Sequence, residues 1–284
     1  YSKEIDVLIM KNIVILGASG FLGSELLKKL DENKFQLKSL YHKRKIDSKF
    51  NSVKGSILSQ SSLNSLISNN DIVINLTGQF SKNFEDFFQV NLNGTMNLLN
   101  VIKNKKNVKL IHISSIDVYG NKNSFSKESD KPSPSSIYAT TKLLTEQLCE
   151  KFSKENNLDV TLLRFSNIYG PHKKNGIITN LLNSKESDKP INLTHKGKQI
   201  RDFLFIDDAI DGIIQAIDKF KPGFRIFNIS SGKKTSVLDI IKEMKKNNLI
   251  LNYKITSSTP DDFCICANNS KSKNSLSFKP KMKF

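Results

Sequence analysis

A glycine-rich turn directly after a short apolar run constrains the fold of this chain most. The apolar run Ile13–Leu16 leads into a turn with three glycines, and apolar residues then recur at helical spacing as far as Leu30. This order lets backbone N–H groups approach a pyrophosphate at the start of the helix, where the helix dipole favours negative charge. It predicts a dinucleotide site whose contacts are Gly17, Ser19, Gly20, Phe21, Leu22 and Gly23.

Strand-like and helix-like segments alternate over the first part of the chain. Strands are predicted at Phe35–Tyr41, Asp71–Leu76, Lys109–Ser114 and Asp159–Arg164, and helices at Phe87–Ile102 and Tyr138–Glu155. Such alternation is typical of an α/β fold with a doubly wound parallel sheet, the Rossmann fold. Ligands of this fold bind at the carboxyl ends of the strands.

The pattern loosens after residue 165. Short strands near Ile191–Leu193 and Phe203–Ile206 and helices at Ile177–Asn183, Asp207–Asp218 and Val237–Lys246 indicate a second region. We predict a dinucleotide-binding domain over residues 10–165. A smaller, mainly substrate-binding lobe then covers residues 166–284, with segments near 200–230 returning to the main sheet. The tail Asn268–Ser275 is rich in Lys, Ser and Asn and is predicted to be mobile.

The charge of +17 comes almost entirely from lysine. The chain has 40 Lys but only four Arg, and the lysines are spread evenly along it. Such an even spread indicates compositional drift of the solvated surface rather than a nucleic-acid site. An arginine that persists in such a chain indicates a need for the planar guanidinium group. The four are Arg44, Arg164, Arg201 and Arg225.

Other features of the composition favour a reducing, cytoplasmic setting without a metal. An odd count of three cysteines, two of them at C-x-C spacing, argues against a disulfide framework. The four histidines are scattered, and no apolar run approaches the ~18 residues of a membrane span. The first ten residues do not resemble a signal peptide. Met10 is a candidate start, with residues 1–9 an extension that has no role in the fold.

The end of the second predicted strand is basic. It reads Tyr41-His42-Lys43-Arg44-Lys45, and no carboxylate occurs before Asp47. A carboxylate at this place would bind the ribose 2′-hydroxyl of NAD, whereas cations suit the 2′-phosphate of NADP. We therefore expect NADP as the cofactor, with NAD as the alternative. Lys43 and Arg44 would be its contacts, and Arg44 the bidentate one.

Tyr138 and Lys142 stand four residues apart in a predicted helix, so both side chains share one face. A free tyrosine, with a pKa of ~10, is a poor acid or base at neutral pH. A nearby ammonium group and a cationic nicotinamide both favour the phenolate. Ser115, at a predicted strand end, would hydrogen-bond the same substrate oxygen. These three candidate catalytic residues indicate hydride and proton transfer on a carbohydrate-like alcohol or ketone.

With these motifs the sequence resembles the extended short-chain dehydrogenases/reductases, in particular the nucleotide-sugar epimerase/dehydratase group. The resemblance covers nearly the whole chain from Lys11, and six further segments match the family in order. They are Asn75–Gly78, Asn91–Thr95, His112–Gly120, Arg164–Pro171, Arg201–Phe203 and Phe227–Ile229.

The resemblance implies further site residues. On the cofactor side, besides Tyr138 and Lys142, these are Ser56, Ile57, Leu76, Thr77, Gly78, Asn91 and Phe165. On the substrate side they are Gln79, Ser115, Asp117, Asn167 and Arg201, with Asn167 on the diphosphate and Arg201 on the nucleotide or its phosphates. Many relatives have Asp where Ser56 follows Gly55, so the adenine contact is expected to differ here.

The resemblance also bounds the reaction. A 4-epimerase and a 4-ketoreductase share one site; the basic end of the second strand favours the reductase, and the generic serine segment allows the epimerase. Dehydratases have Asp-Glu where this chain has Ile116-Asp117, which argues against elimination of water. Asp117 is either one acid/base or a plain loop carboxylate. The family implies a homodimer through the helices Phe87–Ile102 and Tyr138–Glu155. A non-catalytic NAD(P)- or RNA-binding protein of the same fold is the alternative.

Overall fold

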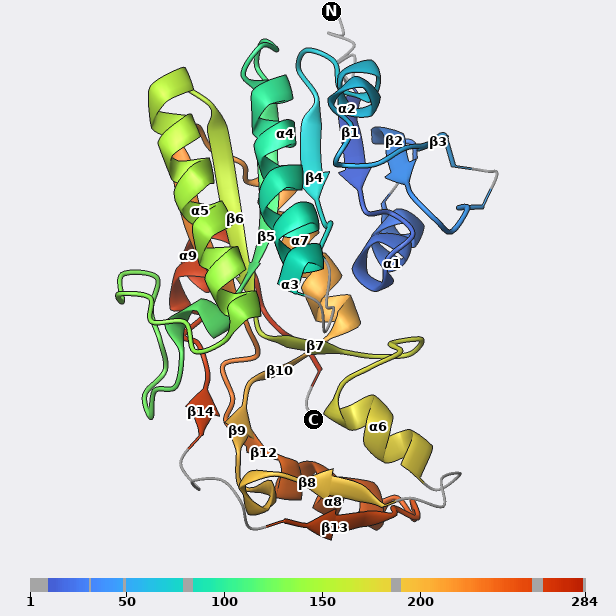
Figure 1. Ribbon diagram of the computed structural model, residues 1–284, viewed down its shortest axis with the longest axis vertical. Helices are drawn as coiled ribbons and strands as arrows, with labels where there is room; N and C mark the ends of the chain where they lie inside the picture. The colour runs from blue at the N-terminus through green and yellow to red at the C-terminus, as the bar shows by residue number, and fades with distance from the viewer. Residues whose placement is uncertain are drawn as a thin grey trace, which may run out of the picture. The chain divides into compact units, whose positions relative to one another are not determined.

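In the part of the chain that the structure describes, the main sheet has seven strands. The computed structural model describes residues 10–30, 32–47, 50–78, 84–184, 190–256 and 263–282. The strands follow the order β11-β6-β5-β4-β1-β2-β3 (Figure 1). They are β1 (Lys11–Leu16), β2 (Phe35–Tyr41), β3 (Ser52–Lys54), β4 (Ile72–Asn75), β5 (Lys109–Ser115), β6 (Asp159–Phe165) and β11 (Phe224–Ile229). The pairs β1–β2, β1–β4, β2–β3 and β4–β5 are parallel, which confirms the predicted α/β fold.

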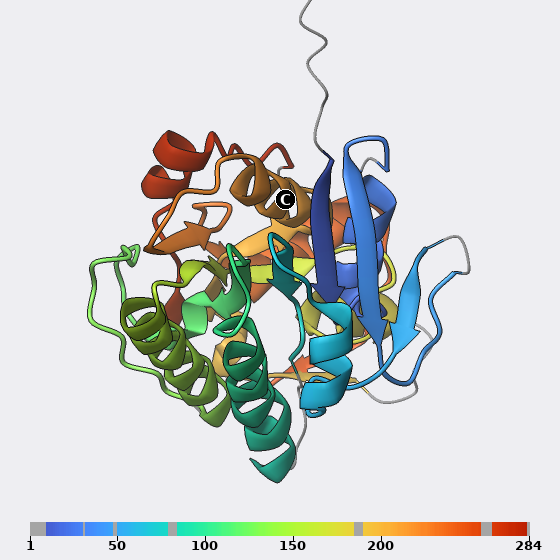
Figure 2. The ribbon, with the colours of Figure 1, turned by 90° about the horizontal axis from the view of Figure 1, so that it is seen from above.

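The centre of the sheet is covered on both faces. Ile13–Leu16 of β1 are all fully buried, and β4 is buried along its whole length. A strand whose successive side chains are all buried has helices or loops on both sides. Figure 2 shows α2 (Gln60–Leu66), α4 (Gly94–Ile102) and α5 (Ile137–Asn156) on one side of the sheet.

The helix predicted at Phe87–Ile102 is present, but its first half is irregular. A short α3 (Phe84–Phe87) leads into a π-helical segment, η1 (Phe88–Asn93), which continues as α4. Asn91 is buried in the π segment, and its carbonyl accepts a hydrogen bond of 2.6 Å from Thr95 Oγ1. Short π segments often occur at functional positions, and the apolar spacing did not predict this one.

The chain forms two compact units, each made of several segments. The first comprises Tyr1–Ile113, Leu144–Leu162 and Phe220–Arg225, and includes α1 (Phe21–Lys29); the second comprises Ser114–Leu143, Leu163–Lys219 and Ile226–Phe284. The remaining elements of the second unit are η2 (Ile116–Tyr119), β7 (Asn167–Tyr169), α6 (Ile177–Asn183), β8 (Ile191–Leu193), η4 (His195–Gly197), β9 (Ile200–Arg201), β10 (Phe203–Phe205), α7 (Ile206–Asp218), β12 (Thr235–Ser236), α8 (Val237–Lys246), β13 (Tyr253–Ile255), β14 (Cys264–Ile265) and α9 (Ser270–Leu276).

The second unit has an apolar core of its own between α6, α8 and the strands beside them (Figure 1). The helix α8 begins with a capping box, in which Ser236 and Asp239 each accept a hydrogen bond from the other's backbone N–H. The buried side chains of α8 pack with residues of α6, β8 and β10. Together the buried residues of this core are Leu181, Leu193, Phe203, Val237, Ile240, Ile241 and Met244.

The prediction of a mobile tail at Asn268–Ser275 is wrong. Most of this segment forms α9, which buries Ser272 and Leu276, and Phe278 just beyond it is also buried. Ser272 Oγ donates a 2.8 Å hydrogen bond to the carbonyl of Asn228. The polar composition concealed the helix because only a few side chains face the interior, and a small serine is one of them.

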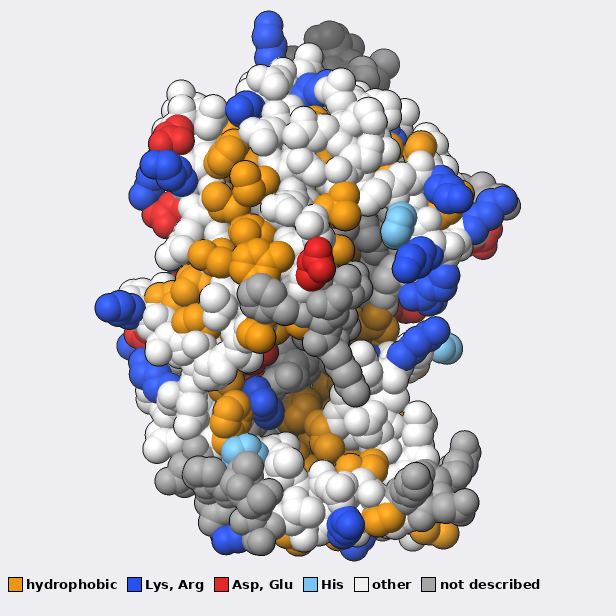
Figure 3. Space-filling model, in the orientation of Figure 1, with side chains coloured by type: hydrophobic (Ala, Val, Ile, Leu, Met, Phe, Trp, Pro, Cys, Tyr) orange, Lys and Arg blue, Asp and Glu red, His pale blue; other side chains and the backbone are white. Residues whose placement is uncertain are grey.

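The surface shows no single basic region on the face drawn in Figure 3, where lysine and arginine side chains lie in separate groups. This arrangement agrees with even use of lysine across the chain. In the described ranges, none of the helices has the length and apolar character needed to cross a bilayer.

Candidate functional site

The glycine turn of the first unit has the geometry of a phosphate cradle. Gly17 has a φ of +84°, a conformation that L side chains rarely adopt, and its carbonyl accepts a 3.0 Å hydrogen bond from the N–H of Gly20. Gly23 in α1 packs so closely on the turn that an added Cβ would lie 2.4 Å from the carbonyl oxygen of Gly17. The glycines therefore let the helix start directly against the end of β1.

The start of α1 suits an anion. Gly20 is its N-cap and provides no side-chain cap, and the first turn has no acidic residue. Unsatisfied N–H groups and the helix dipole attract a phosphate at such an end. The end of β4 adjoins the turn, since a Cβ on Gly17 would lie 3.1 Å from the backbone nitrogen of Thr77. These residues fit the pyrophosphate of a dinucleotide.

Replacing Gly23 by alanine should disrupt this cradle. The new methyl group would meet backbone atoms of Gly17 and Ala18, which can give way only if the turn moves. We expect the Kd for NAD(H) or NADP(H) to rise at least about tenfold, measured by fluorescence titration. The control is Ser24→Ala in the same helix, whose hydroxyl contacts only the carbonyl of Phe21. Equal affinity of the Gly23 variant and wild type would contradict the prediction.

The adenosine side of the predicted site lies at the ends of β2 and β3. Lys43 and Arg44 follow β2 and are exposed. Ile57 is buried and faces Gly94 of α4, where an added Cβ would lie 2.7 Å from its Cγ2. Ser56 Oγ accepts a 3.2 Å hydrogen bond from the N–H of Leu58. The side chains of Lys43 and Arg44 are thus exposed to solvent. Ile57, in the loop after β3, is held in place by packing against α4.

The predicted catalytic side chains all belong to the second unit. Ser115 is the last residue of β5, and Tyr138 and Lys142 lie one turn apart in the first part of α5. Ser115 hydrogen-bonds the Tyr138 hydroxyl. Ser115 and Lys142 are buried, and only 4% of Lys142 is exposed. The serine and the lysine are therefore shielded from bulk water, and Tyr138 between them along the chain is half-buried.

The electrostatic environment of Tyr138 opposes ionisation in the protein alone. Burial and the nearby charge of Asp117 raise the pKa of Tyr138, and the hydrogen bond with Ser115 lowers it. The sequence prediction for the ionisation of Tyr138 considered Lys142 and the cofactor; it named Asp117 as a substrate-side residue but did not include the effect of its charge on the pKa of Tyr138. A base at this position needs positive charge close to the phenol to act near neutral pH.

Asp117 and Arg201 form an ion pair next to Tyr138. Asp117 Oδ1 lies 3.5 Å from Arg201 Nη1, and the guanidinium stacks 4.3 Å from the ring centre of Phe263. Burial raises the pKa of Asp117, while Arg201 and the hydrogen bond with Ser115 lower it. Arg201 is thus held between Asp117 and Phe263 while 28% of its side chain stays exposed, as an arginine that binds phosphate or carboxylate requires.

Asp202 is a buried carboxylate that the sequence prediction missed. Its side chain accepts hydrogen bonds from Ser231 N and Oγ at 2.9 and 2.7 Å and from Gly232 N at 3.1 Å. Its carbonyl accepts a 2.9 Å bond from the N–H of Asn167, a predicted substrate contact. Asp202, the residue directly after Arg201, is therefore hydrogen-bonded to Asn167 of β7. The sequence signal that could have identified Asp202 was its position directly between Arg201 and the apolar strand β10.

The retained Arg164 has a structural environment. It is 3% exposed, its guanidinium carbon lies 4.8 Å above the Tyr119 ring, and its Nη1 donates a 2.8 Å bond to the Tyr119 hydroxyl. That hydroxyl in turn donates to Asn228 Oδ1. Burial raises the pKa of Tyr119 to about 12. The planar guanidinium of Arg164 thus packs within the interior and orders it. The next residue, Phe165, which was predicted on the cofactor side, is also buried.

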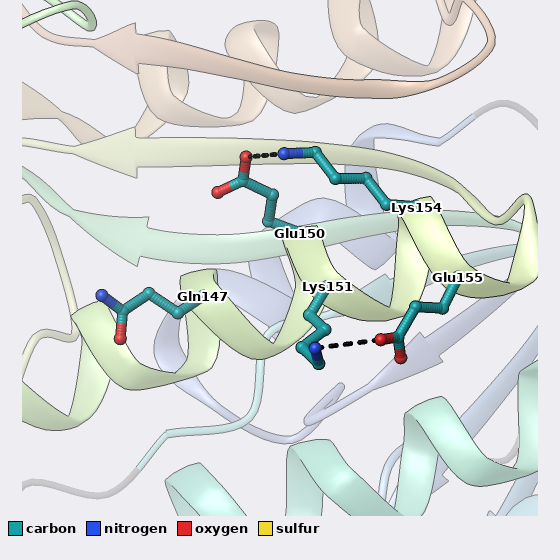
Figure 4. Close-up of a pocket in the computed structure, with 5 residues that line it drawn as sticks. All are labelled: Gln147, Glu150, Lys151, Lys154 and Glu155. Carbon is teal, nitrogen blue, oxygen red and sulfur yellow. Dashed lines mark hydrogen bonds and ion pairs between the residues drawn. The ribbon is translucent and has the colours of Figure 1, made fainter.

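Three further points concern the extent of the site. The predicted substrate contact Gln79 lies outside the described residues. The pocket in Figure 4 lies on the outer face of α5, where solvated ion pairs join Lys154 to Glu150 at 2.7 Å and Lys151 to Glu155 at 2.9 Å. It includes none of the predicted site residues. Within the part of the chain that the structure describes, no three His, Cys, Asp or Glu side chains lie together as a metal site.

Comparison with known proteins places the chain in a family. The model of the NAD dependent epimerase/dehydratase family matches residues 13–230. A UDP-N-acetyl-alpha-D-glucosaminuronate decarboxylase of Bacillus cytotoxicus is 30% identical over 82% of this chain and 79% of its own length. The chain therefore belongs to the NAD-dependent epimerase/dehydratase family, a group of extended short-chain dehydrogenases/reductases, as the resemblance predicted.

Other similar proteins are named as epimerases. An uncharacterized UDP-glucose epimerase of Bacillus subtilis is 27% identical over 81% of this chain and 79% of its own. The crystal structure of a UDP-glucuronic acid 4-epimerase from Bacillus cereus, in complex with UDP-glucuronic acid and NAD, is 28% identical. It superposes with a TM-score of 0.85 over 96% of this chain and 95% of that one. The relatives thus bind or act on nucleotide sugars.

Proposed function

We propose that the protein is a nucleotide-sugar 4-epimerase that uses Tyr138 as its acid and base. The observation that carries the proposal is the hydrogen bond between Ser115 and Tyr138, with the buried Lys142 one turn further along α5. The similarity to a UDP-glucuronic acid 4-epimerase supports this reaction. The Asp117–Arg201 pair supplies a guanidinium for the diphosphate of the substrate.

The proposed mechanism assigns a task to each side chain. A bound nicotinamide dinucleotide supplies the hydride acceptor for the oxidation and the hydride donor for the reduction. Tyr138 removes the proton of the C4 hydroxyl and later returns a proton to the C4 oxygen of the keto sugar. Ser115 donates a hydrogen bond to that oxygen, and the Lys142 ammonium favours the phenolate. Asn167 and Arg201 hold the diphosphate while the sugar turns its other face to the cofactor.

The two compact units contribute different groups in this proposal. The first unit, with the glycine turn, holds the pyrophosphate of the dinucleotide, and the second unit supplies the catalytic side chains and the contacts to the sugar nucleotide. We further propose a homodimer that pairs the helices α4 and α5 of two chains. Met96 of α4 and Ile137 of α5 are 39% and 50% exposed, so each helix offers one exposed apolar side chain to a partner in this proposal.

The carboxylate beside Tyr138 gives a prediction about pH. Asp117 raises the pKa of Tyr138, so Asp117→Asn should lower it, and the freed Arg201 charge acts in the same direction. The limb of the pH profile of kcat/KM that requires an ionised Tyr138 should therefore move to lower pH. Asp130→Asn, on an exposed loop of the same unit, is the control. A limb that stays in place or moves to higher pH would refute this electrostatic coupling.

A 4-ketoreductase that uses NADP is the second candidate. The exposed Lys43 and Arg44 at the end of β2, with no carboxylate before Asp47, favour a 2′-phosphate. A reductase exchanges its cofactor in every turnover, whereas an epimerase keeps it. The nature of the cofactor therefore separates the two reactions.

The first experiment is to denature the purified protein and identify any dinucleotide that it releases. Nearly one NAD(H) or NADP(H) per chain, together with interconversion of UDP-glucose or UDP-glucuronic acid and its 4-epimer, would support the epimerase. An empty site that binds NADPH much more tightly than NADH would favour the reductase. Affinity for neither, with strongly salt-dependent retention on RNA, would support a non-catalytic nucleic-acid-binding protein.

A further inference from the structure

A chain of buried hydrogen bonds runs across the first unit to the edge of the glycine turn. Asn75, the last residue of β4, lies beside His112 of β5, and Asn75 Nδ2 is 3.1 Å from His112 Nδ1. His112 Nε2 is 3.3 Å from Thr145 Oγ1 of α5. Only 1% of each of these three side chains is exposed. The polar groups are therefore shielded from water, where hydrogen bonds constrain geometry strongly.

The other end of this chain fixes the backbone after β4. Asn75 Oδ1 accepts hydrogen bonds from Thr77 N at 3.1 Å and from Thr77 Oγ1 at 2.6 Å. The backbone nitrogen of Thr77 is in turn one of the atoms that a Cβ added to Gly17, the first glycine of the turn, would meet, at 3.1 Å. The orientation of the Asn75 amide thus fixes the backbone of Thr77, which lies beside the glycine turn.

The imidazole is the partner of the other end of this amide. With Oδ1 bound to two donors of Thr77, Nδ2 of Asn75 faces His112, so Nδ1 of the ring is the acceptor. A neutral ring that accepts at Nδ1 carries its proton at Nε2, on the side of Thr145. If the acceptor were lost, Nδ2 would have no partner there, and the reason for Asn75 to present its oxygen to Thr77 would weaken.

We infer that His112 is a positioning residue for the dinucleotide: through Asn75 it holds Thr77 against the glycine turn and so fixes the shape of the cofactor cradle. This inference rests on the proposed function, because it assumes that the cradle binds NAD(H) or NADP(H). It assigns to His112 of β5 and Thr145 of α5 a part in cofactor binding, and neither residue is among the predicted contacts. His112 itself needs no contact with the cofactor for this role.

The test compares three variants by fluorescence titration with NADH and NADPH and by thermal unfolding. His112→Leu removes the acceptor and should raise the Kd about tenfold. His112→Gln offers a carbonyl oxygen to Asn75 and should recover most of the affinity. Thr145→Val, a milder change at the far end, should raise the Kd by about twofold to threefold and keeps the test valid if the leucine variant does not fold.

The control is Ser39→Ala, which removes a buried hydroxyl in β2 that donates to the carbonyl of Asn51 and lies outside the hydrogen-bonded chain. It should lower the unfolding temperature without changing the Kd. Wild-type affinity in His112→Leu, or equal Kd values for the leucine and glutamine variants, would overturn the inference while leaving the proposed function intact. If the wild-type protein bound no dinucleotide, both would fail.

Discussion

Tyr138→Phe should lower kcat about a thousandfold and leave the affinity for the dinucleotide nearly unchanged. The substitution removes only the hydroxyl that hydrogen-bonds Ser115, and it keeps the ring that packs at the start of α5. Proton transfer by a positioned side chain contributes about 10²–10⁴ in rate. Because the hydroxyl is also the nearest hydrogen-bonding group to the reacting oxygen in the proposal, the loss should lie in the upper half of that range.

The measurement is a single-turnover assay with UDP-glucuronic acid or UDP-glucose, followed by the absorbance of the reduced cofactor. Tyr253→Phe is a matched control, since its hydroxyl accepts a bond from the exposed Lys245 on the same unit but far along the chain from the motif. It should retain full activity. A Tyr138→Phe enzyme with more than half of the wild-type rate would exclude Tyr138 as the acid/base and with it the proposed mechanism.

The parts of the site that depend on one element could be predicted from the sequence. Tyr138 and Lys142 are one turn apart on α5, and Ser115 ends β5, because helix periodicity and strand length fix such relations locally. The glycine turn was also predictable, since its conformation requires glycine at Gly17.

The contacts between elements could not be predicted in this way. His112 meets Asn75 only because β4 and β5 pair in a particular register. Phe263 covers Arg201 although 62 positions separate them, and Asp202 reaches Ser231 by a similar long-range contact. No local pattern carries this information, because a side chain's partner across the fold depends on how the whole chain packs. The prediction of the charges that act on Tyr138 was therefore incomplete, because it left out Asp117.

Arg201→Met should raise the KM for the nucleotide sugar by about 10- to 100-fold, with a much smaller effect on kcat. The guanidinium lies over the ring of Phe263 and is paired with Asp117, so it is already held in place before a substrate binds. Hydrogen bonds to a charged partner contribute about 1.5–3 kcal/mol, and each 1.4 kcal/mol is a factor of ten in binding. Arg201→Lys keeps the charge but loses the planar fork and should be intermediate.

The same substitution also removes the counter-ion of Asp117, so a loss of stability must be separated from a loss of substrate binding. The double variant Asp117→Asn with Arg201→Met has no unpaired carboxylate and should unfold at a higher temperature than Arg201→Met alone. Its KM should nevertheless stay high, because the contact with the diphosphate is still missing. Recovery of a wild-type KM in the double variant would show that Arg201 serves only to neutralise Asp117. A KM that remains raised, together with unchanged dinucleotide affinity, would assign Arg201 to the sugar nucleotide and separate the tasks of the two units.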